Sequence, residues 1–148
     1  MMTRLGYVAF GTLLAAAHVH AGGTPTTTST TTTTLASGCV AEPAFSSVLC
    51  RLDELVAAVE GATDLGRFRE GVLNSARKAR RQCQTAAAST GRRASNQLKK
   101  CAHTLGSFRH KLDSNNAHRV IPDSTRIALT DYMSVPLQND VKTLRGTL

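Results

Sequence analysis

The sequence predicts an all-α fold, a disulfide-stapled antiparallel up-down-up-down four-helix bundle formed by residues 39–148. Three observations lead to this prediction. Apolar residues recur three and four positions apart through most of the segment, which is the spacing of helices that bury one face. Glycine and proline residues divide that pattern into four stretches joined by short connections, and short connections favour an up-down-up-down order. The chain has four cysteines, and an even number in a small exported domain is typical of a disulfide framework.

The first 21 residues carry the features of a cleavable export signal. Arg4 supplies the positive charge, residues 5–17 form a run of thirteen apolar or small residues, and Val19-His20-Ala21 provides a suitable cleavage site. Thirteen such residues are too few to cross a bilayer, and no later stretch approaches the length that a membrane helix needs. We therefore predict a signal peptide at residues 1–21 and a secreted or periplasmic protein without a transmembrane segment.

Threonine dominates the next segment, residues 22–38, which we predict to be a disordered linker. Its first sixteen residues include nine threonines, and Leu35 is the one side chain among them that could anchor the segment to a core. Such a composition cannot bury enough surface to offset the chain entropy lost on folding. Mucin-like O-glycosylation of the threonines is the alternative to an unmodified spacer.

The stretch TTTTTLASGC, residues 30–39, raises the question whether Cys39 accepts a lipid. A lipoprotein cleavage site has to follow the apolar run of the signal directly, whereas sixteen polar or small residues separate Ala21 from Gly38. Ala36 also stands where leucine is usual. We therefore predict that Cys39 is a disulfide partner and not a lipid anchor.

The first three helices are expected at residues 46–60, from Thr63 or Asp64 to about residue 90, and at 93–115. Gly61 ends the first, and the sequence around Gly91 ends the second. The apolar positions of the first helix follow a three-four-three spacing, at Leu49, Leu52, Val56 and Val59.

The second and third predicted helices can be aligned as an antiparallel hairpin. Residues at equal distances from the turn then lie at the same height, and each of the five resulting layers is apolar on both sides. Three layers place an alanine opposite a large residue, as a helical seam needs to fill its volume. The layers are Ala86 with Leu98, Cys83 with Cys101, Ala79 with Leu105, Ala76 with Phe108, and Val72 with Leu112.

This register also predicts the disulfides. Four cysteines allow three pairings, and the hairpin selects Cys83 with Cys101, which leaves Cys39 with Cys50. Closing loops of this size contributes about 3 kcal/mol each in the chain-entropy model.

A fourth helix is expected from about Pro122 or Ser124 to Gly146. Pro136 removes one backbone hydrogen bond there and crowds the preceding turn, so we predict a kink or a split near Val135. The predicted inward face consists of Ala128, Tyr132, Val135, Val141 and Leu144.

Charge is the one functional indication in the sequence. Residues 65–119 hold thirteen lysines and arginines but only Glu70 and Asp113 as acids. Carboxylates of the first and fourth helices can neutralise part of this excess, and a charged run is often only a solvated face. Like charges this close repel one another, however, so we predict an anionic partner at the hairpin tip. The predicted site is Arg77, Lys78, Arg80, Arg81, Arg92, Arg93, Lys99 and Lys100.

The candidate partners are acidic polysaccharide, lipid head groups and acidic protein. Specific nucleic acid recognition is not expected, because base stacking needs aromatic side chains and none lies between Phe68 and Phe108. Catalysis, metal binding and cofactors are not expected either. His103 and His110 lie seven residues apart, too far to share a metal, and the cysteines are assigned to disulfides.

Two resemblances accompany these predictions. The segments GATDLGRF, IPDSTRIAL and DVKTLRG, with the export signal, the threonine-rich linker and the four cysteines, resemble a group of small exported bacterial helical proteins that has no assigned function. The order of a local N-terminal bridge followed by a bridge across the second and third helices is similar to that of the plant invertase and pectin methylesterase inhibitors. This second likeness concerns architecture alone, and fold does not imply function.

Two functions are therefore considered. The first is an exported, non-catalytic binding or scaffolding module whose basic hairpin tip contacts an anionic partner, and whose binding weakens steeply with salt. The alternative is a proteinaceous inhibitor of an exported enzyme, which would form a stoichiometric complex that is insensitive to salt.

Overall fold

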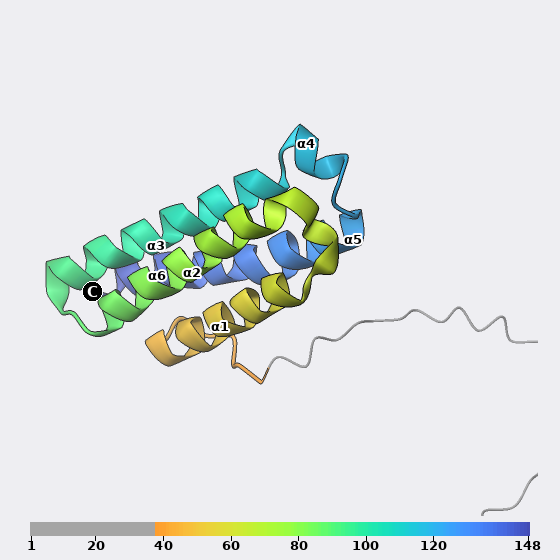
Figure 1. Cartoon of the computed structure of the whole chain (residues 1–148). Coiled ribbons are helices and arrows are strands. Elements are labelled where there is room, and N and C mark those ends of the chain that lie inside the picture. Colours follow the sequence, from red (N-terminus) through yellow and green to blue (C-terminus); the bar gives the residue numbers. More distant parts are fainter. Residues whose placement is uncertain (1–37) are drawn as a thin grey trace, which may run out of the picture. The chain divides into compact units, whose positions relative to one another are not determined.

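A computed structural model describes residues 38–148, and all of the regular structure in this range is helical (Figure 1). The predicted signal peptide at 1–21 and the predicted linker at 22–38, apart from Gly38, lie outside the described residues. Within them the two predicted disulfides are present: Cys39 is bonded to Cys50, and Cys83 to Cys101.

The first helix, α1, spans Phe45–Gly61, within one residue of the predicted range at each end. Its buried stripe differs slightly from the prediction, because Leu55 is fully buried while Leu49 and Val56 are half-buried. In the first turn of α1, Ser47 Oγ donates a hydrogen bond to Val40 O, which precedes the helix. This contact and the Cys39–Cys50 disulfide hold the start of the described chain against α1.

The predicted start of the second helix is wrong. Thr63–Phe68 forms a 3₁₀ segment, η1, and the α-helix α2 spans Arg69–Ala87. Gly66 has a φ of 48°, a left-handed conformation that glycine adopts without steric cost but that ends a regular helix. The apolar spacing continues through this break, since Leu65 is buried like the residues of α2, and spacing alone therefore could not reveal it.

The third helix, α3, spans Gly91–Leu112 and follows α2 after the short turn at residues 88–90. It ends three residues before the predicted limit because Ser114 starts a new helix. Ser114 Oγ accepts a hydrogen bond from Ala117 N and caps the four-residue helix α4, Asn115–His118.

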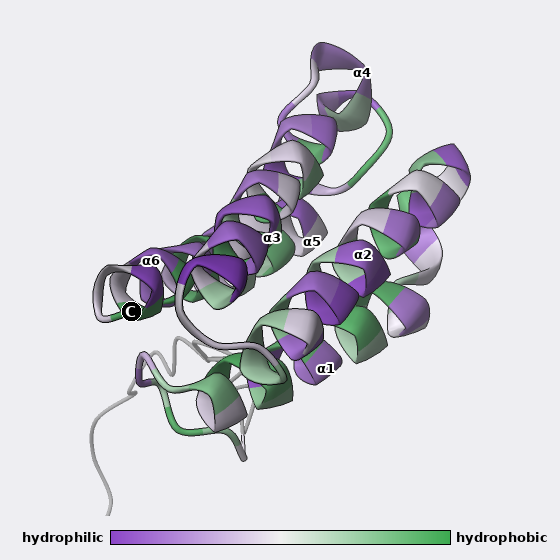
Figure 2. Cartoon of the chain, turned by 90° about the vertical axis from the view of Figure 1, so that its left-hand side faces the viewer, coloured by the Kyte–Doolittle hydropathy of each residue, from purple (hydrophilic) through white to green (hydrophobic). Residues whose placement is uncertain are grey.

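The hairpin layers predicted for α2 and α3 are all buried. Each of the ten residues has no exposed surface, and the Cα atoms of Cys83 and Cys101 lie 5.8 Å apart. The outer sides of both helices are hydrophilic, and their hydrophobic sides face the neighbouring helices (Figure 2).

The last long stretch runs without interruption through three segments. These are α5 (Asp123–Ile127), the π-helical η2 (Ala128–Ser134) and α6 (Val135–Gly146). The helix changes type just before Pro136 and is not split there. A proline has no N–H to donate, and the wider π-helical turn accommodates that loss.

The π-helical segment also explains why part of the predicted inward face is wrong. A π-turn holds more residues than an α-turn and so rotates the side chains around it. Tyr132, expected inside, is 75% exposed, and Ala128 and Val135 are only half-buried. Leu129 and Leu137 are buried in their place, whereas Val141 and Leu144 are buried as predicted.

The long helices enclose one core with Phe108 as its largest fully buried side chain. Helix α2 packs against α1 and α3, α3 also packs against α6, and α6 contacts α1. None of the helices described here combines the length and the apolar character that crossing a membrane requires.

Candidate anion-binding groove

Two of the predicted site residues are paired with carboxylates of α1. Arg77 Nη2 lies 2.7 Å from Glu60 Oε1, and Arg80 Nε donates to Asp53 Oδ1. The hydrogen bond to Asp53, and then the negative charge of that carboxylate, raise the pKa of Arg80 above its ordinary value. The charges of Arg77 and Arg80 are therefore already balanced within the protein.

A groove lined by charged and polar residues, with the alkyl parts of their side chains forming much of its surface, runs between α2 and α3 on a different side of α2. Its larger hollow has a volume of about 700 Å³ and its smaller one about 330 Å³. Lys78, His103 and Thr104 line both hollows, so the two adjoin. The larger hollow adds Gln82, Asn96, Lys99 and Lys100, and the smaller adds Asn74, Ser75, Ser107 and Lys111.

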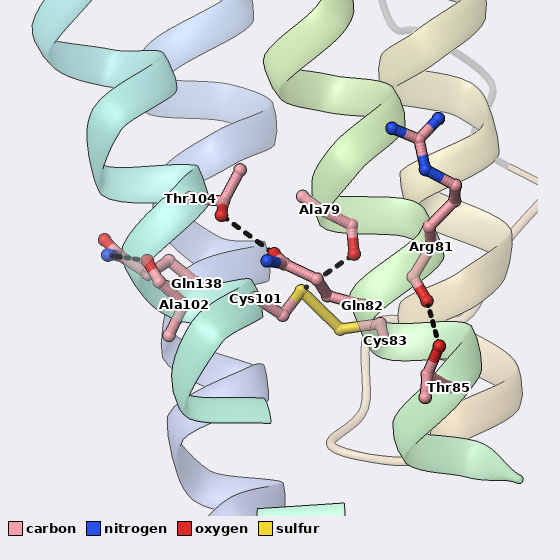
Figure 3. Close-up of a disulfide and its surroundings, with 9 residues drawn as sticks. All are labelled: Ala79, Arg81, Gln82, Cys83, Thr85, Cys101, Ala102, Thr104 and Gln138. Carbon is pink, nitrogen blue, oxygen red and sulfur yellow. Dashed lines mark hydrogen bonds between the residues drawn. A yellow bond between two sulfur atoms is a disulfide. The ribbon is translucent and has the colours of Figure 1, made fainter. Parts of the chain in front are cut away.

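Side-chain hydrogen bonds join the two helices along this groove. Thr104 Oγ1 donates to Gln82 Oε1 over 2.8 Å, close to the buried Cys83–Cys101 disulfide (Figure 3). The groove therefore rests on a part of the hairpin that is covalently fixed.

The end of the groove farthest from the turn is fixed by Lys111. Its Nζ donates to Gly71 O and to Ser75 Oγ, both over 2.8 Å. Two of the three ammonium donors are therefore used inside the protein, while the positive charge remains at the surface.

The charged side chains that line the groove are all basic. Lys78, Lys99 and Lys100 are exposed, and none of them forms an ion pair with another residue of the range 38–148. No acidic side chain is among the described residues that line either hollow. The arrangement can attract a negatively charged molecule, and it holds no built-in carboxylate that would compete.

The first turn of α3 adds two further cations at the end of the groove nearest the turn. Arg92 and Arg93 are exposed, and Asn96 lies one helical turn farther along. Cations are unfavourable at a helix N-terminus, where the helix dipole is positive, and no acidic residue occupies this first turn. An anion bound here would relieve that repulsion.

The eight predicted cations therefore do not form one cluster. Lys78, Lys99 and Lys100 meet in the groove, and Arg92 and Arg93 lie beyond its end. Arg77 and Arg80 face α1. Arg81 extends away from α3 and the disulfide (Figure 3).

The sequence-based site omitted several residues that line the groove. Among the omitted residues, His103 and Lys111 have basic side chains, and Thr104 and Gln82 have uncharged polar side chains. A signal was available, because one stripe of α3 is polar at a spacing of four, three, four and four. The stripe consists of Asn96, Lys100, His103, Ser107 and Lys111.

Away from the groove, residues 38–148 contain one group of three side chains whose metal-ligating atoms lie close together. The sulfur atoms of Cys39 and Cys50 and a carboxylate oxygen of Glu54 lie within 4.8 Å of one another. Both sulfurs belong to a disulfide, whereas a metal would need the thiolate form.

Comparison of the chain with protein-family models, with curated proteins and with solved structures finds no match to any of them.

Proposed function

We propose that this protein is an exported, non-catalytic binding module whose α2–α3 groove and adjoining turn hold an anionic partner. One observation carries the proposal. Lys78 of α2 and Lys99 and Lys100 of α3 line a groove without a carboxylate, although two arginines elsewhere on α2 are paired with acids.

The contrast matters because uncompensated charge has a cost. Like charges held together repel and destabilise the folded state slightly. The surface between α1 and α2 avoids this repulsion with Asp53 and Glu60. The groove keeps its repulsion, which an external anion would remove.

The fold that presents the groove is, in our proposal, an antiparallel up-down-up-down four-helix bundle. The four members are α1, α2, α3 and the continuous stretch of α5, η2 and α6. Support comes from the packing of each of these four on two others and from the short turn between α2 and α3. Short connections place consecutive helices side by side in opposite directions.

Export is part of the same proposal. Two disulfides within a small domain suit an oxidising compartment, and residues 1–21 have the composition of a cleavable signal. Expression in a host with a secretion pathway and N-terminal sequencing of the exported product test this part. A mature N-terminus at Gly22 is expected, and a product that keeps Arg4 would contradict it.

Retention on immobilised heparin, a general polyanion, tests the proposed binding. The full chain, expressed with its own export signal, is expected to bind at low salt and to elute as the salt concentration rises. Replacing Lys78, Lys99 and Lys100 together by glutamine should shift elution to clearly lower salt, because these side chains face the ligand.

A matched control removes the same number of exposed cations elsewhere. Replacing Arg119, Lys142 and Arg145 by glutamine gives the same net charge, and all three are exposed outside the groove. This variant should elute close to the unmodified protein. Equal shifts for the two variants would mean that net charge alone determines retention, and the groove would then have no special role.

A further inference from the structure

We propose that the α2–α3 groove binds a single chain of a linear acidic polysaccharide, a polyuronate, which lies along the helix axes. This inference rests on the proposed function, and it adds the chemical class and the binding mode of the ligand.

The length of the groove is the first argument. Because the two hollows share Lys78, His103 and Thr104, they follow one another along α3 from Asn96 to Lys111. These end points are fifteen residues apart on α3, or about 22 Å at the rise of an α-helix. A small anion would occupy a fraction of such a groove, whereas an extended chain would fill it.

The distribution of charge is the second argument. Lys99 and Lys100 lie toward the turn, Lys78 lies where the hollows join, and Lys111 lies at the far end. A ligand that satisfies all of them has to carry negative charges at intervals along its length. Lysine is a flexible point charge without the fixed fork of arginine, so it tolerates variation in that interval.

The neutral lining is the third argument. Asn74, Asn96 and Ser107 add amide and hydroxyl groups that form no side-chain hydrogen bond across the groove within residues 38–148, and Ser107 Oγ donates to the backbone of its own helix, at His103 O. Amides and hydroxyls both donate and accept hydrogen bonds, as the hydroxyls of a sugar do. The lining has no phenylalanine, tyrosine or tryptophan side chain on which a nucleobase could stack, and the imidazole of His103 is its one aromatic ring.

A membrane surface is a poorer match for this groove. Proteins that lie on membranes usually add apolar side chains that enter the lipid beside the cations. The large apolar side chains exposed within residues 38–148 are Val40, Val120, Tyr132 and Leu148, and none of them lines the groove.

Calorimetric titration with mannuronate oligomers of defined length tests the inference on the full, exported chain. Affinity should rise strongly from the monomer to an oligomer that spans the groove, and should then level off. The Lys78, Lys99 and Lys100 glutamine variant should bind the long oligomer at least about tenfold more weakly. The Arg119, Lys142 and Arg145 glutamine variant should bind it as the unmodified protein does.

Other outcomes separate the two levels of the proposal. Equal affinity for monomer and long oligomer would overturn the extended binding mode, and tighter binding to vesicles rich in anionic phospholipid would overturn the polysaccharide. Both would leave groove-dependent retention on heparin intact. Absence of binding to the oligomers, the vesicles and heparin alike would overturn the proposed function as well. All substituted lysines are exposed, so an unchanged melting temperature should confirm that each variant is folded.

Discussion

Helix α2 is joined to its two neighbours by different chemistry. Toward α1, exposed ion pairs connect Arg77 with Glu60 and Arg80 with Asp53, beside an apolar seam. Toward α3, the joint consists of a buried disulfide, layers of alanine against larger side chains, and hydrogen bonds such as Thr104 to Gln82.

This difference explains which cations are free. On the α1 side, the arginines take part in holding the helices together, so their charge is used within the protein. On the α3 side, a disulfide and hydrogen bonds hold the helices, including those from Lys111 to Gly71 O and Ser75 Oγ. Lys78, Lys99 and Lys100 form no ion pair within residues 38–148. Three lysines without an ion-pair partner in residues 38–148, gathered in one groove, are the feature that the binding proposal explains.

The largest expected effect comes from breaking the covalent joint. Replacing Cys83 and Cys101 together by alanine should lower the free energy of unfolding by about 3 kcal/mol, since the unfolded chain loses a crosslink. Denaturant unfolding followed by circular dichroism measures this. The variant should also lose affinity for polyanions, because α2 and α3 can then shift and the groove widens.

The N-terminal disulfide supplies the control for this experiment. Replacing Cys39 and Cys50 by alanine opens a shorter loop, with a sequence separation of 11 instead of 18, and leaves the α2–α3 joint intact. Polyanion binding should persist under conditions where that variant is folded. If both disulfide variants bind as the unmodified protein does, the groove does not depend on the rigid joint.

A smaller effect is expected from the hydrogen bond across the groove floor. Thr104 is nearly buried, and valine has almost its shape but lacks its hydroxyl. Thr104→Val should cost about 1–2 kcal/mol, because Gln82 Oε1 loses its donor in a half-buried site. Thermal unfolding measures the change, and Thr143→Val, at an exposed position of α6, is the matched control. A stabilised Thr104→Val protein would show that apolar packing holds this joint without the hydrogen bond.

The ion pairs on the α1 side should matter less still. Asp53→Asn and Glu60→Gln each remove an exposed partner, and exposed pairs contribute only about 0.2–1 kcal/mol. The double variant frees Arg77 and Arg80, so retention on heparin should increase slightly. If retention on heparin rises by more than it falls in the variant with Lys78, Lys99 and Lys100 replaced, the main binding surface lies beside α1 and not in the groove.

The sequence predicted the parts of this molecule that depend on periodic burial. The α2–α3 register, both disulfides and the extent of α1 follow from spacing, because an α-helix has a fixed number of residues per turn. Errors occurred where that number changes. The left-handed Gly66 broke the second helix, and the π-helical segment turned Tyr132 outward.

The candidate site was predicted only as a set of charges. Composition showed that residues 77–100 are basic, but it could not show that Arg80 faces Asp53 while Lys78 does not. That distinction depends on which side of α2 each residue occupies relative to both neighbours. The spacing of residues within α2 alone does not reveal where α1 and α3 pack against it, so the sequence could not separate the paired arginines from the unpaired lysine.

The smallest expected effect is at the pair of Asp123 and Arg126 outside α2, in which the carboxylate is exposed and the guanidinium is partly buried, and which measures what an ion pair with an exposed carboxylate contributes in this protein. The hydrogen bond from Arg126, and then the positive charge of Arg126, lower the pKa of Asp123 below its ordinary value. Folding therefore favours the ionised form. The stabilisation is present above the ordinary aspartate pKa of about 3.9 and is lost as the pH falls through the lowered value.

Asp123→Asn should accordingly lower the melting temperature slightly at neutral pH, and the difference from the unmodified protein should shrink below about pH 4. Arg126 keeps Asp113 as a partner at 3.6 Å, which limits the loss. Melting temperatures of both proteins across the acidic range measure this. A difference that grows on acidification would mean that the carboxyl group stabilises the fold in its protonated form, and exposed ion pairs would then be an unsuitable reference for the contacts between α1 and α2.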